Sequence, residues 1–504
     1  MPKETFHWVE NISEEIIRRK KEPFVITCGA TLSGPMHLGT LCEILYPSLI
    51  AKFLQNKGYK VEFIFFSDDY DAFDSIPFVF KQFEFLKEHL GKPLVHVPDP
   101  LECHKSYAEH MLEEVKEVIE KLEIEPKPRI VSMYEYYKAG KFDPYAINFI
   151  KDYELIRKIV FETSLREDKG QYWHPLMVVC KNCGKIATTR VTKVDLEHKE
   201  IHYVCDLDVD YTKGCGYEGI EKFNEHNWKL TWRLHWPAEM DLHNTSAEGA
   251  GKDHHTKGGS WDTCKAIFER YFKKEPPVTW KHGLILYHGK KYSKSKGIGT
   301  PLRELIEVLP PQIIKFIVAR TDIESDKNID PNVIELLKVF NELKQLEELK
   351  QKLESGEIKK AELSRAQIKK LTAYSLIGEV KWKEDISTAL INYQLGKPIS
   401  PYLKKYIEKW FELSYIPNDL KFEFKPKEKL DEEVKYFISK LDEQMNAKQI
   451  HDLVYKTAEE LGIKPSELFK KIYLNLIGKE RGPRLGKLIE AISVKKVKRL
   501  VNNS

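Results

Sequence analysis

A glycine-rich segment with one histidine stands near the start of the chain. It reads CGATLSGPMHLGT over residues 28–40, with glycines at 29, 34 and 39 and a histidine at 37. Glycines let a ligand approach the backbone closely, and a helix N-terminus favours phosphate. His37 at such a helix start can donate a hydrogen bond to a phosphate oxygen. The glycine spacing matches neither the dinucleotide-binding fingerprint nor the P-loop, so it predicts a nucleotide phosphate site of another kind.

The second segment that could do chemistry is a lysine-rich loop. It reads KKYSKSKG over residues 290–297 and follows the apolar run LILYHG. The ammonium groups of Lys291 and Lys294 can offset the charge that develops on a leaving pyrophosphate. By itself the loop could be a basic turn exposed to water. A His-x-Gly segment about 250 residues earlier makes a shared triphosphate site the more specific interpretation.

Four of the eight cysteines form a pattern that suits a metal. Cys180 and Cys183 are separated by two residues, and Cys205 and Cys215 follow. Tetrahedral thiolate coordination of zinc needs two close ligands on one turn, which a Cys-x2-Cys knuckle provides. The pattern favours a structural four-cysteine zinc ribbon over four free thiols, with three nearby histidines as reserve ligands. A closed four-thiolate site has no open position for catalysis.

The elements around the glycine-rich segment must place its residues at one edge of a sheet. The apolar run PFVITCGA precedes it, a stretch with helical spacing follows up to Gly58, and YKVEFIFF is a second strand-like run. Strand, loop, helix and strand in this order predict a βαβ unit with a buried parallel sheet. Ligands of such sheets lie beyond the carboxyl ends of the strands. Asp68, Asp69 and Asp71 follow the second run and can supply a counter-charge for a cation.

Composition limits the class of protein. The chain has 504 residues, of which 42% are hydrophobic and 31% charged, and its mean hydropathy is -0.46. No apolar run approaches the roughly 20 residues that a membrane helix needs. The start MPKETFHWVE is polar, so we expect no signal peptide, no membrane association and a cytoplasmic protein. The oligomeric state stays open, with a monomer slightly favoured.

The near-neutral net charge of +4 hides an uneven distribution. Acids slightly outnumber lysines and arginines before about residue 330, whereas basic residues are in excess after it. The pattern also turns helical beyond that point. We therefore place the main domain boundary near residue 330 and expect a polyanionic partner for the basic helices.

Several motifs together carry a resemblance to a known family. HLGT and KYSKS resemble the two signatures of class I aminoacyl-tRNA synthetases. TLSGPMHLGT, WRLHWPAEM and EGAGKDHHTKGGSWD are similar to segments of class I lysyl-tRNA synthetases, as are the cysteine segment and the helical end. The resemblance covers nearly the whole chain. Phe73, Asp74 and Ser75 depart from it, because the family often has an Arg-Lys pair after its acidic run.

The resemblance implies an α/β fold with a Rossmann-type nucleotide-binding catalytic domain, a zinc-ribbon-like insertion and an all-helical C-terminal anticodon-binding domain. The expected division is residues 1–172 for the first half of the catalytic domain, 173–222 for the insertion, 223–330 for the second half, and 331–504 for the tRNA-binding helices.

The resemblance also implies the roles of individual residues. The expected catalytic residues are His37 and Lys294. The expected ATP site consists of Ser33, Gly34, His37, Gly39, Thr40, Lys291, Ser293, Lys294 and Ser295. The expected amino-acid site consists of Gly29, Thr31, Asp68, Asp69, Trp236, Asp253 and His254.

The activity implied is that of a lysine--tRNA ligase. ATP and L-lysine would give lysyl-adenylate, and the lysyl group would pass to tRNA(Lys), with Mg2+ on the phosphates and structural zinc on the cysteines. The alternatives are another class I synthetase such as glutamyl-tRNA synthetase, a nucleotidyltransferase of the same fold, and a non-catalytic zinc-ribbon RNA-binding protein. An acidic strand end disfavours a glutamate enzyme, and intact His37 and Lys294 disfavour a silent protein.

Overall fold

The computed structural model describes residues 6–165, 173–287, 290–291, 302–329 and 333–502. The chain divides into two compact units. The first consists of Met1–Ile306, Ile314–Ile329 and Ser364–Ile377, and the second of Glu307–Ile313, Asp330–Leu363 and Gly378–Ser504. This division differs from a single boundary near residue 330 at two segments: Ser364–Ile377 belongs with the first unit, and Glu307–Ile313 with the second.

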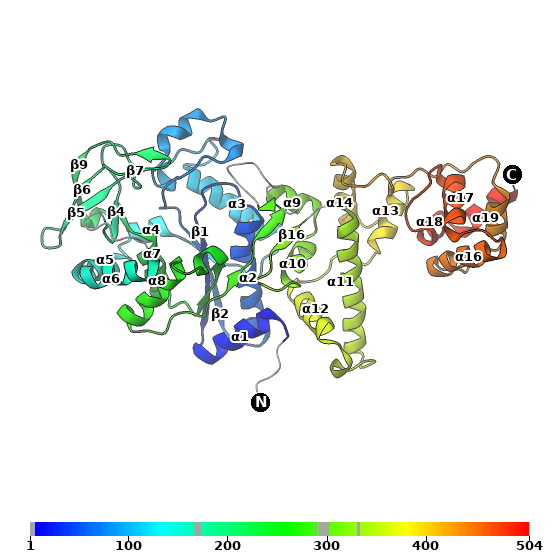
Figure 1. The fold of residues 1–504 in the computed structure, drawn as a ribbon, viewed down its shortest axis with the longest axis horizontal. Coiled ribbons are helices and arrows are strands. Elements are labelled where there is room, and N and C mark those ends of the chain that lie inside the picture. Colours follow the sequence, from blue (N-terminus) through cyan, green and yellow to red (C-terminus); the bar gives the residue numbers. More distant parts are fainter. Residues whose placement is uncertain (1–5, 166–172, 288–289, 292–301, 330–332, 503–504) are drawn as a thin grey trace. The chain divides into compact units, whose positions relative to one another are not determined.

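A parallel sheet forms the centre of the first unit, as the sequence predicted (Figure 1). Its strand order is β11-β1-β2-β3, with β1 at Phe24–Ala30, β2 at Val61–Ser67, β3 at Arg129–Ser132 and β11 at Ala247–Glu248. All three pairings are parallel, with Phe24 opposite Val61 and Ile26 opposite Ala247. Parallel strands need a crossover, which the helix α2 (Leu38–Asn56) supplies between β1 and β2.

Helix α2 is buried along most of its length because its sequence is apolar on nearly every side. The first helix, α1 (Trp8–Arg19), packs against α2. Between β2 and β3 lie the helix α3 (Tyr107–Lys121) and short 3-10 turns. These helices contribute to the burial of the middle of the sheet.

The second half of this unit returns to the sheet after the inserted strands. Its helices are α4 (Met133–Lys138), α5 (Asp143–Lys151), α6 (Tyr153–Ser164), α7 (Trp232–Leu242), α8 (Ser260–Ala266), a π-helical turn at Ile267–Phe272, α9 (Leu302–Val308), α10 (Pro311–Ala319) and α12 (Arg365–Leu376). Its further strands are β12 (Ala250–Gly251), β13 (Lys281–His282), β14 (Ile285–Tyr287), β15 (Lys290–Lys291) and β16 (Lys327–Ile329).

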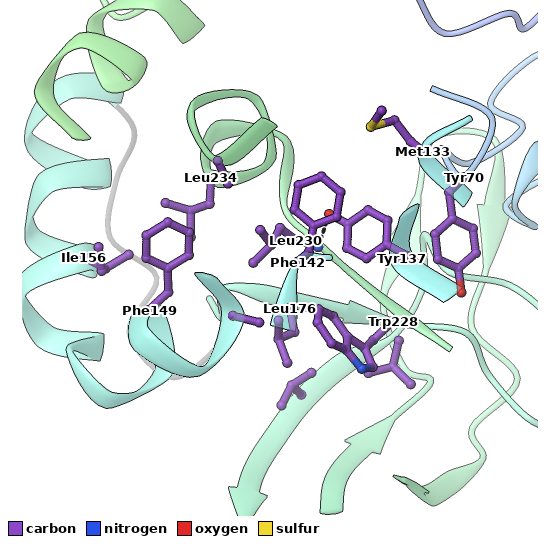
Figure 2. Packing of buried hydrophobic residues seen from close by; sticks show 14 of the residues in the cluster. Tyr70, Met133, Tyr137, Phe142, Phe149, Ile156, Leu176, Trp228, Leu230 and Leu234 are labelled. Atoms are coloured by element: carbon purple, nitrogen blue, oxygen red, sulfur yellow. Dashed lines mark hydrogen bonds between the residues drawn. The ribbon is translucent and has the colours of Figure 1, made fainter. Parts of the chain in front are cut away.

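The cysteine segment consists of short antiparallel strands. They are β4 (Leu176–Val178), β5 (Arg190–Asp195), β6 (Glu200–Val204), β7 (Asp208–Val209), β8 (Thr212–Lys213), β9 (Glu218–Lys222) and β10 (Trp228–Leu230). One aromatic core joins them to the catalytic body, with Tyr137, Phe142 and Trp228 among its members (Figure 2). The insertion is therefore packed onto the body that holds the sheet.

Every described secondary-structure element from residue 333 to the end of the second unit is a helix. Its helices are α11 (Val333–Glu354), α13 (Ile386–Gln394), α14 (Pro401–Glu412), α15 (Glu432–Ser439), α16 (Ala447–Glu460), α17 (Pro465–Ile477), α18 (Leu485–Ile492) and α19 (Val494–Asn502). A core of leucine, isoleucine and valine joins α15 to α19. At Gly486 an added Cβ would lie 1.9 Å from the carbonyl oxygen of Ala447, so only glycine lets α18 approach α16 this closely. Among the described helices none has the length and apolar character needed to cross a bilayer.

Candidate active site

A cavity of about 560 Å³ opens at the carboxyl ends of β1, β2 and β11. This is the edge at which parallel α/β sheets bind ligands. Most of the site residues expected from the sequence line it: Gly29, Thr31, His37, Gly39, Thr40, Asp68, Trp236, Asp253 and His254. The other lining residues are Ala30, Glu43, Asp71, Trp232, Glu239, Glu248, Gly249, Ala250, Gly251, Lys252, His282, Gly283 and Leu284. Segments more than 200 residues apart thus meet in one place.

His37 is the N-cap of α2. Its Nδ1 accepts hydrogen bonds from the backbone N–H of Gly39 at 2.9 Å and of Thr40 at 3.3 Å. Because Nδ1 is an acceptor, the ring proton lies on Nε2 and makes that atom a donor. A donor at a helix N-terminus, where backbone N–H groups also point outward, is suited to an anionic phosphate.

Two of the three acids that follow β2, Asp68 and Asp71, line the cavity. Asp71 accepts a hydrogen bond from Thr31 Oγ1 at 2.7 Å and forms an ion pair with the buried Lys229. Burial alone would raise the pKa of Asp71, but the neighbouring ammonium lowers it below its usual value. Asp68 is buried too and faces the same space. These carboxylates give the cavity an acidic floor.

Asp69 is separate from this floor. Its carboxylate accepts hydrogen bonds from Ser132 Oγ at 2.5 Å and from the backbone N–H of Tyr134 at 2.8 Å. Asp69 therefore ties the end of β2 to the start of α4, and it is not among the residues that line the cavity. Adjacent residues at a strand end point in opposite directions, so two neighbouring acids cannot both face one ligand.

Aromatic rings form one wall of the cavity. Trp232 and Trp236 stack with ring centroids 5.5 Å apart, and His254 lies 5.8 Å from Trp236. The indole N–H of Trp236 donates to Glu248 Oε1 at 2.7 Å, while Thr27 bonds the other oxygen. Burial raises the pKa of Glu248 to about 8, so this carboxyl is mostly neutral at pH 7. Glu248 acts as a polar anchor for the indole wall.

Among the acids and histidines that line the cavity, four are not expected from the sequence: Glu43, Glu239, Glu248 and His282. Glu43 lies four residues after Gly39, so helical spacing could have found it. His282 Nε2 is 3.0 Å from Glu43 Oε1, although 239 residues separate them. Glu248 and His282 carry no local signal, because only the sheet brings them to this edge.

The remaining expected ATP residues do not join the cavity lining. The carbonyl of Ser33 accepts a hydrogen bond from the hydroxyl of Tyr107 at 3.0 Å, and Gly34 is buried. Lys291 pairs with Leu286 in the hairpin of β14 and β15. Ser293, Lys294 and Ser295 lie outside the described residues. Their roles stay predictions.

The four cysteines of the insertion converge. Cys180 Sγ is 3.7 Å from Cys215 Sγ, Cys183 Sγ is 3.7 Å from Cys205 Sγ, and all four sulfurs lie within 4.8 Å of one another. Tetrahedral zinc with Zn–S bonds of about 2.3 Å requires sulfurs about 3.8 Å apart. Gly184 and Gly216 have φ angles of +73° and +77° and close the two tight turns. The donor set and its spacing fit a zinc ion.

A second cluster of metal-ligand type lies outside the cavity. Cys103 Sγ is 3.1 Å from His104 Nδ1 and 3.2 Å from His110 Nδ1, and Asp99 Oδ1 is 3.1 Å from His110 Nδ1. The four donor atoms lie within 4.8 Å of one another. Cys103 is exposed, unlike Cys28, Cys42 and Cys264, which are buried outside any cysteine cluster. The spacing Asp-x3-Cys-His-x5-His could have shown the cluster.

The parallel sheet, the helix start capped by His37 and the cavity at the strand ends define a nucleotide-binding catalytic domain of the class I synthetase type. The family described as tRNA synthetases class I (K) matches residues 6–372. A lysine--tRNA ligase of Archaeoglobus fulgidus is 32% identical over 98% of both chains. One of Methanocaldococcus jannaschii is 31% identical over 96% of this chain and 97% of its own. The chain belongs to the class I lysyl-tRNA synthetase family.

The solved structures that resemble the chain include a glutamate tRNA ligase from Elizabethkingia meningosepticum. It is 15% identical, with a TM-score of 0.39, over 95% of this chain and 99% of its own.

Proposed function

We propose that the protein activates L-lysine with ATP in this cavity and transfers the lysyl group to the 3′-terminal adenosine of tRNA(Lys). The observation that carries the proposal is the polarity of the cavity. A phosphate-binding helix start with His37 lies at one part of its wall, and the acids Asp68 and Asp71 form its floor. One end suits a triphosphate and the other suits a cationic side chain. We place the reaction in the cytoplasm, where tRNA is charged.

The chemistry is an in-line displacement. A carboxylate oxygen of lysine attacks the α-phosphorus of ATP, the bond to the bridging oxygen breaks, and pyrophosphate leaves with the electron pair. The hydroxyl of the terminal adenosine then attacks the lysyl carbonyl, and AMP leaves. Such reactions need positioning and charge stabilisation more than covalent catalysis by the protein. Mg2+ carried by the phosphates would offset part of their charge.

Two donors of this chain would act on the phosphates. His37 Nε2–H, fixed in its tautomer by the N-cap hydrogen bonds, would donate to a phosphate oxygen. Lys294 corresponds to the second signature lysine and would balance the charge on the departing pyrophosphate. Both contacts strengthen as charge develops, so they lower the barrier and do not merely tighten binding.

The acidic floor favours lysine over glutamate. Glutamate would need cationic partners for its side chain, but no arginine is among the described residues that line the cavity. The lysine Lys252 at its rim is paired with Asp326 Oδ1 at 2.9 Å. A buried charged partner discriminates far better than an apolar slot, because the wrong substrate leaves that partner unpaired.

The helices beyond residue 330 would bind the anticodon region of the tRNA. Their excess of lysine and arginine suits the phosphate backbone. The strongest local excess is in α19, where Lys495, Lys496, Lys498 and Arg499 follow one another within five residues. Single-stranded anticodon bases would stack on exposed aromatic side chains of these helices.

Zinc would be structural in this protein. The four thiolates of the insertion would close a tetrahedral site with no position left for substrate. The cluster of Asp99, Cys103, His104 and His110 has the ligand types for a second zinc ion, and its loop lies between β2 and α3. Either ion would add stability to its segment beyond what hydrophobic packing supplies.

Amino-acid-dependent ATP–pyrophosphate exchange tests the function, run with each amino acid and with or without total tRNA. The tRNA arm matters because the family resemblance suggests that activation needs tRNA. We expect exchange and tRNA charging with L-lysine. Charging with glutamate or another amino acid, and none with lysine, would overturn the proposal.

A further inference from the structure

Three buried side chains meet beneath the floor of the cavity. His235 on α7 has its Nε2 atom 3.4 Å from Asp68 Oδ1 and 3.2 Å from Glu239 Oε2. The side chains of Asp68, His235 and Glu239 are 5%, 0% and 3% exposed. Of the three, Asp68 and Glu239 also line the cavity, whereas His235 lies behind them. One imidazole nitrogen is thus shared by two carboxylates that face the substrate.

The imidazole cannot turn away from the carboxylates. Its Nδ1 lies 2.8 Å from the hydroxyl of Tyr137, which also accepts the backbone N–H of Leu230 at 3.0 Å. The ring stacks on Tyr137 and packs against Phe142, with centroids 5.7 Å and 5.1 Å away. Figure 2 shows Tyr137, Phe142 and Leu230 inside the packed aromatic core. A rigid wall therefore aims Nε2 at Asp68 and Glu239.

The two buried carboxylates need a cation between them. Two carboxylates in a buried site repel each other, and one takes up a proton unless a cation lies between them. Burial would lower the pKa of His235, but the two carboxylates raise it to about 9, so the ring is an imidazolium. Burial raises the pKa of Glu239 to about 7 even beside that cation, so the charged form of Glu239 depends on His235.

The floor holds one more carboxyl group than it holds cationic groups. The ionisable floor groups are Asp68, Asp71 and Glu239 on one side and Lys229 and His235 on the other. Glu248 is mostly neutral, and Glu43 at the rim has its own partner in His282. A single excess carboxylate charge matches a single ammonium group.

We infer that His235 is a positioning residue that sets the charge of the lysine pocket. Its imidazole lies between Asp68 and Glu239, offsets the repulsion between the two carboxylates when it is protonated, and so favours their charged forms toward the ε-ammonium group. Without it, a proton shared between Asp68 and Glu239 would tie the two together and withdraw their charge from the cavity. The inference rests on the proposed activation of lysine and adds a group that never touches the substrate.

The test compares His235→Gln with the wild type in binding of two ligands. Glutamine keeps a hydrogen-bond donor near Nε2 but carries no charge. L-norleucine has the side-chain length of L-lysine without the ammonium. By isothermal titration calorimetry we expect His235→Gln to raise the Kd for lysine about 10-fold, as for loss of one charge-assisted contact, and to change the Kd for norleucine less than about 2-fold.

The matched control is His243→Gln at the C-terminal end of the same helix. His243 stacks on Tyr136 and is not among the residues that line the cavity, so both affinities should stay as in the wild type. A double-mutant cycle adds Asp68→Asn. If His235 acts through Asp68, the combined change is clearly smaller than the sum of the single changes.

Equal weakening of lysine and norleucine binding by His235→Gln would overturn the inference, because it would show a general loss of structure. Additive effects of the two substitutions would do the same. If His235→Gln does not fold, Tyr137→Phe removes the Nδ1 partner of His235 together with the acceptor of the Leu230 N–H. It should weaken lysine binding by a smaller factor and leave norleucine binding unchanged. A metal ion that is lost specifically in His235→Gln would also overturn it, since the three atoms would then be metal ligands. Failure of the proposed function would look different, with no lysine activation by the wild type.

Discussion

Replacing Gly39 with alanine should disable the phosphate end of the cavity without removing any charged group. An added Cβ would lie 2.7 Å from His37 Cε1 and 2.9 Å from its Nδ1. Carbon and nitrogen atoms in van der Waals contact stay about 3.5 Å apart, so the imidazole would have to move. That movement breaks the two N-cap hydrogen bonds and takes Nε2 away from the phosphate.

Two magnitudes follow from this geometry. Loss of the N-cap costs about 1 kcal/mol of stability. Loss of one donor that acts on developing charge costs about 3 kcal/mol of activation free energy, which corresponds to a roughly 100-fold lower kcat. The decrease should be in kcat of lysine-dependent ATP–pyrophosphate exchange, measured with tRNA present, and thermal unfolding reports the stability.

Gly58→Ala is the matched control at the other end of the same helix. Gly58 has a φ angle of +90° and no neighbour within 4 Å of an added Cβ, so alanine there costs about 1 kcal/mol through backbone strain alone. It should lower stability like Gly39→Ala and leave exchange within about 2-fold of wild type. A Gly39→Ala enzyme with the wild-type kcat would refute the assignment of His37 as the phosphate donor.

Three further predictions follow from the site. Lys294→Ala should lower kcat of exchange about 100- to 1,000-fold with intact folding, and wild-type activity would show that the second signature does not contact ATP. Cys205→Ser should lower the zinc content by one ion per chain, measured by mass spectrometry, and the insertion should then be proteolysed faster. The control Cys264→Ser lies outside both clusters and should keep all metal. Burial raises the pKa of Glu248 to about 8 in the folded protein. The folded state therefore favours the neutral carboxyl, and this contribution to the free energy of unfolding is complete below pH 4.5 and is lost as pH rises through 8. Wild-type stability in urea should therefore fall by about 3 kcal/mol between pH 5 and 8, and Glu248→Gln should flatten that slope; equal slopes would contradict it.

The sequence could predict that Gly29, His37, Gly39 and Thr40 lie together at the edge of the sheet, because the signals for this part of the cavity are local. The apolar run before residue 30, the glycines and His37 lie on one continuous segment, and a strand followed by a helix start is enough to point them at a phosphate. The cysteine knuckle is local in the same sense, since Cys180 and Cys183 lie on one turn. The Asp-Cys-His-His cluster has comparable spacing, and it was missed because its ligands include an aspartate and no second cysteine.

The amino-acid end could not be predicted in the same way. Among the three acids after β2, pleat direction and hydrogen-bond partners decide that Asp68 faces the cavity, that Asp71 pairs with Lys229 and that Asp69 caps α4. These partners lie 60 to 160 residues away, so no local pattern distinguishes one acid from the next.

The sequence by itself determined the class of fold and the family, and it predicted where phosphate would bind, because all three depend on residue types at short spacing. Only the tertiary structure decided the charge of the amino-acid pocket. That charge is the balance of carboxylates and cations from β2, β10 and α7, and burial changes which of them are ionised. Electrostatic interactions between groups far apart in the sequence arise only when the sheet has formed. His235 has no distinguishing signal in the sequence, yet the fold places it between two acids.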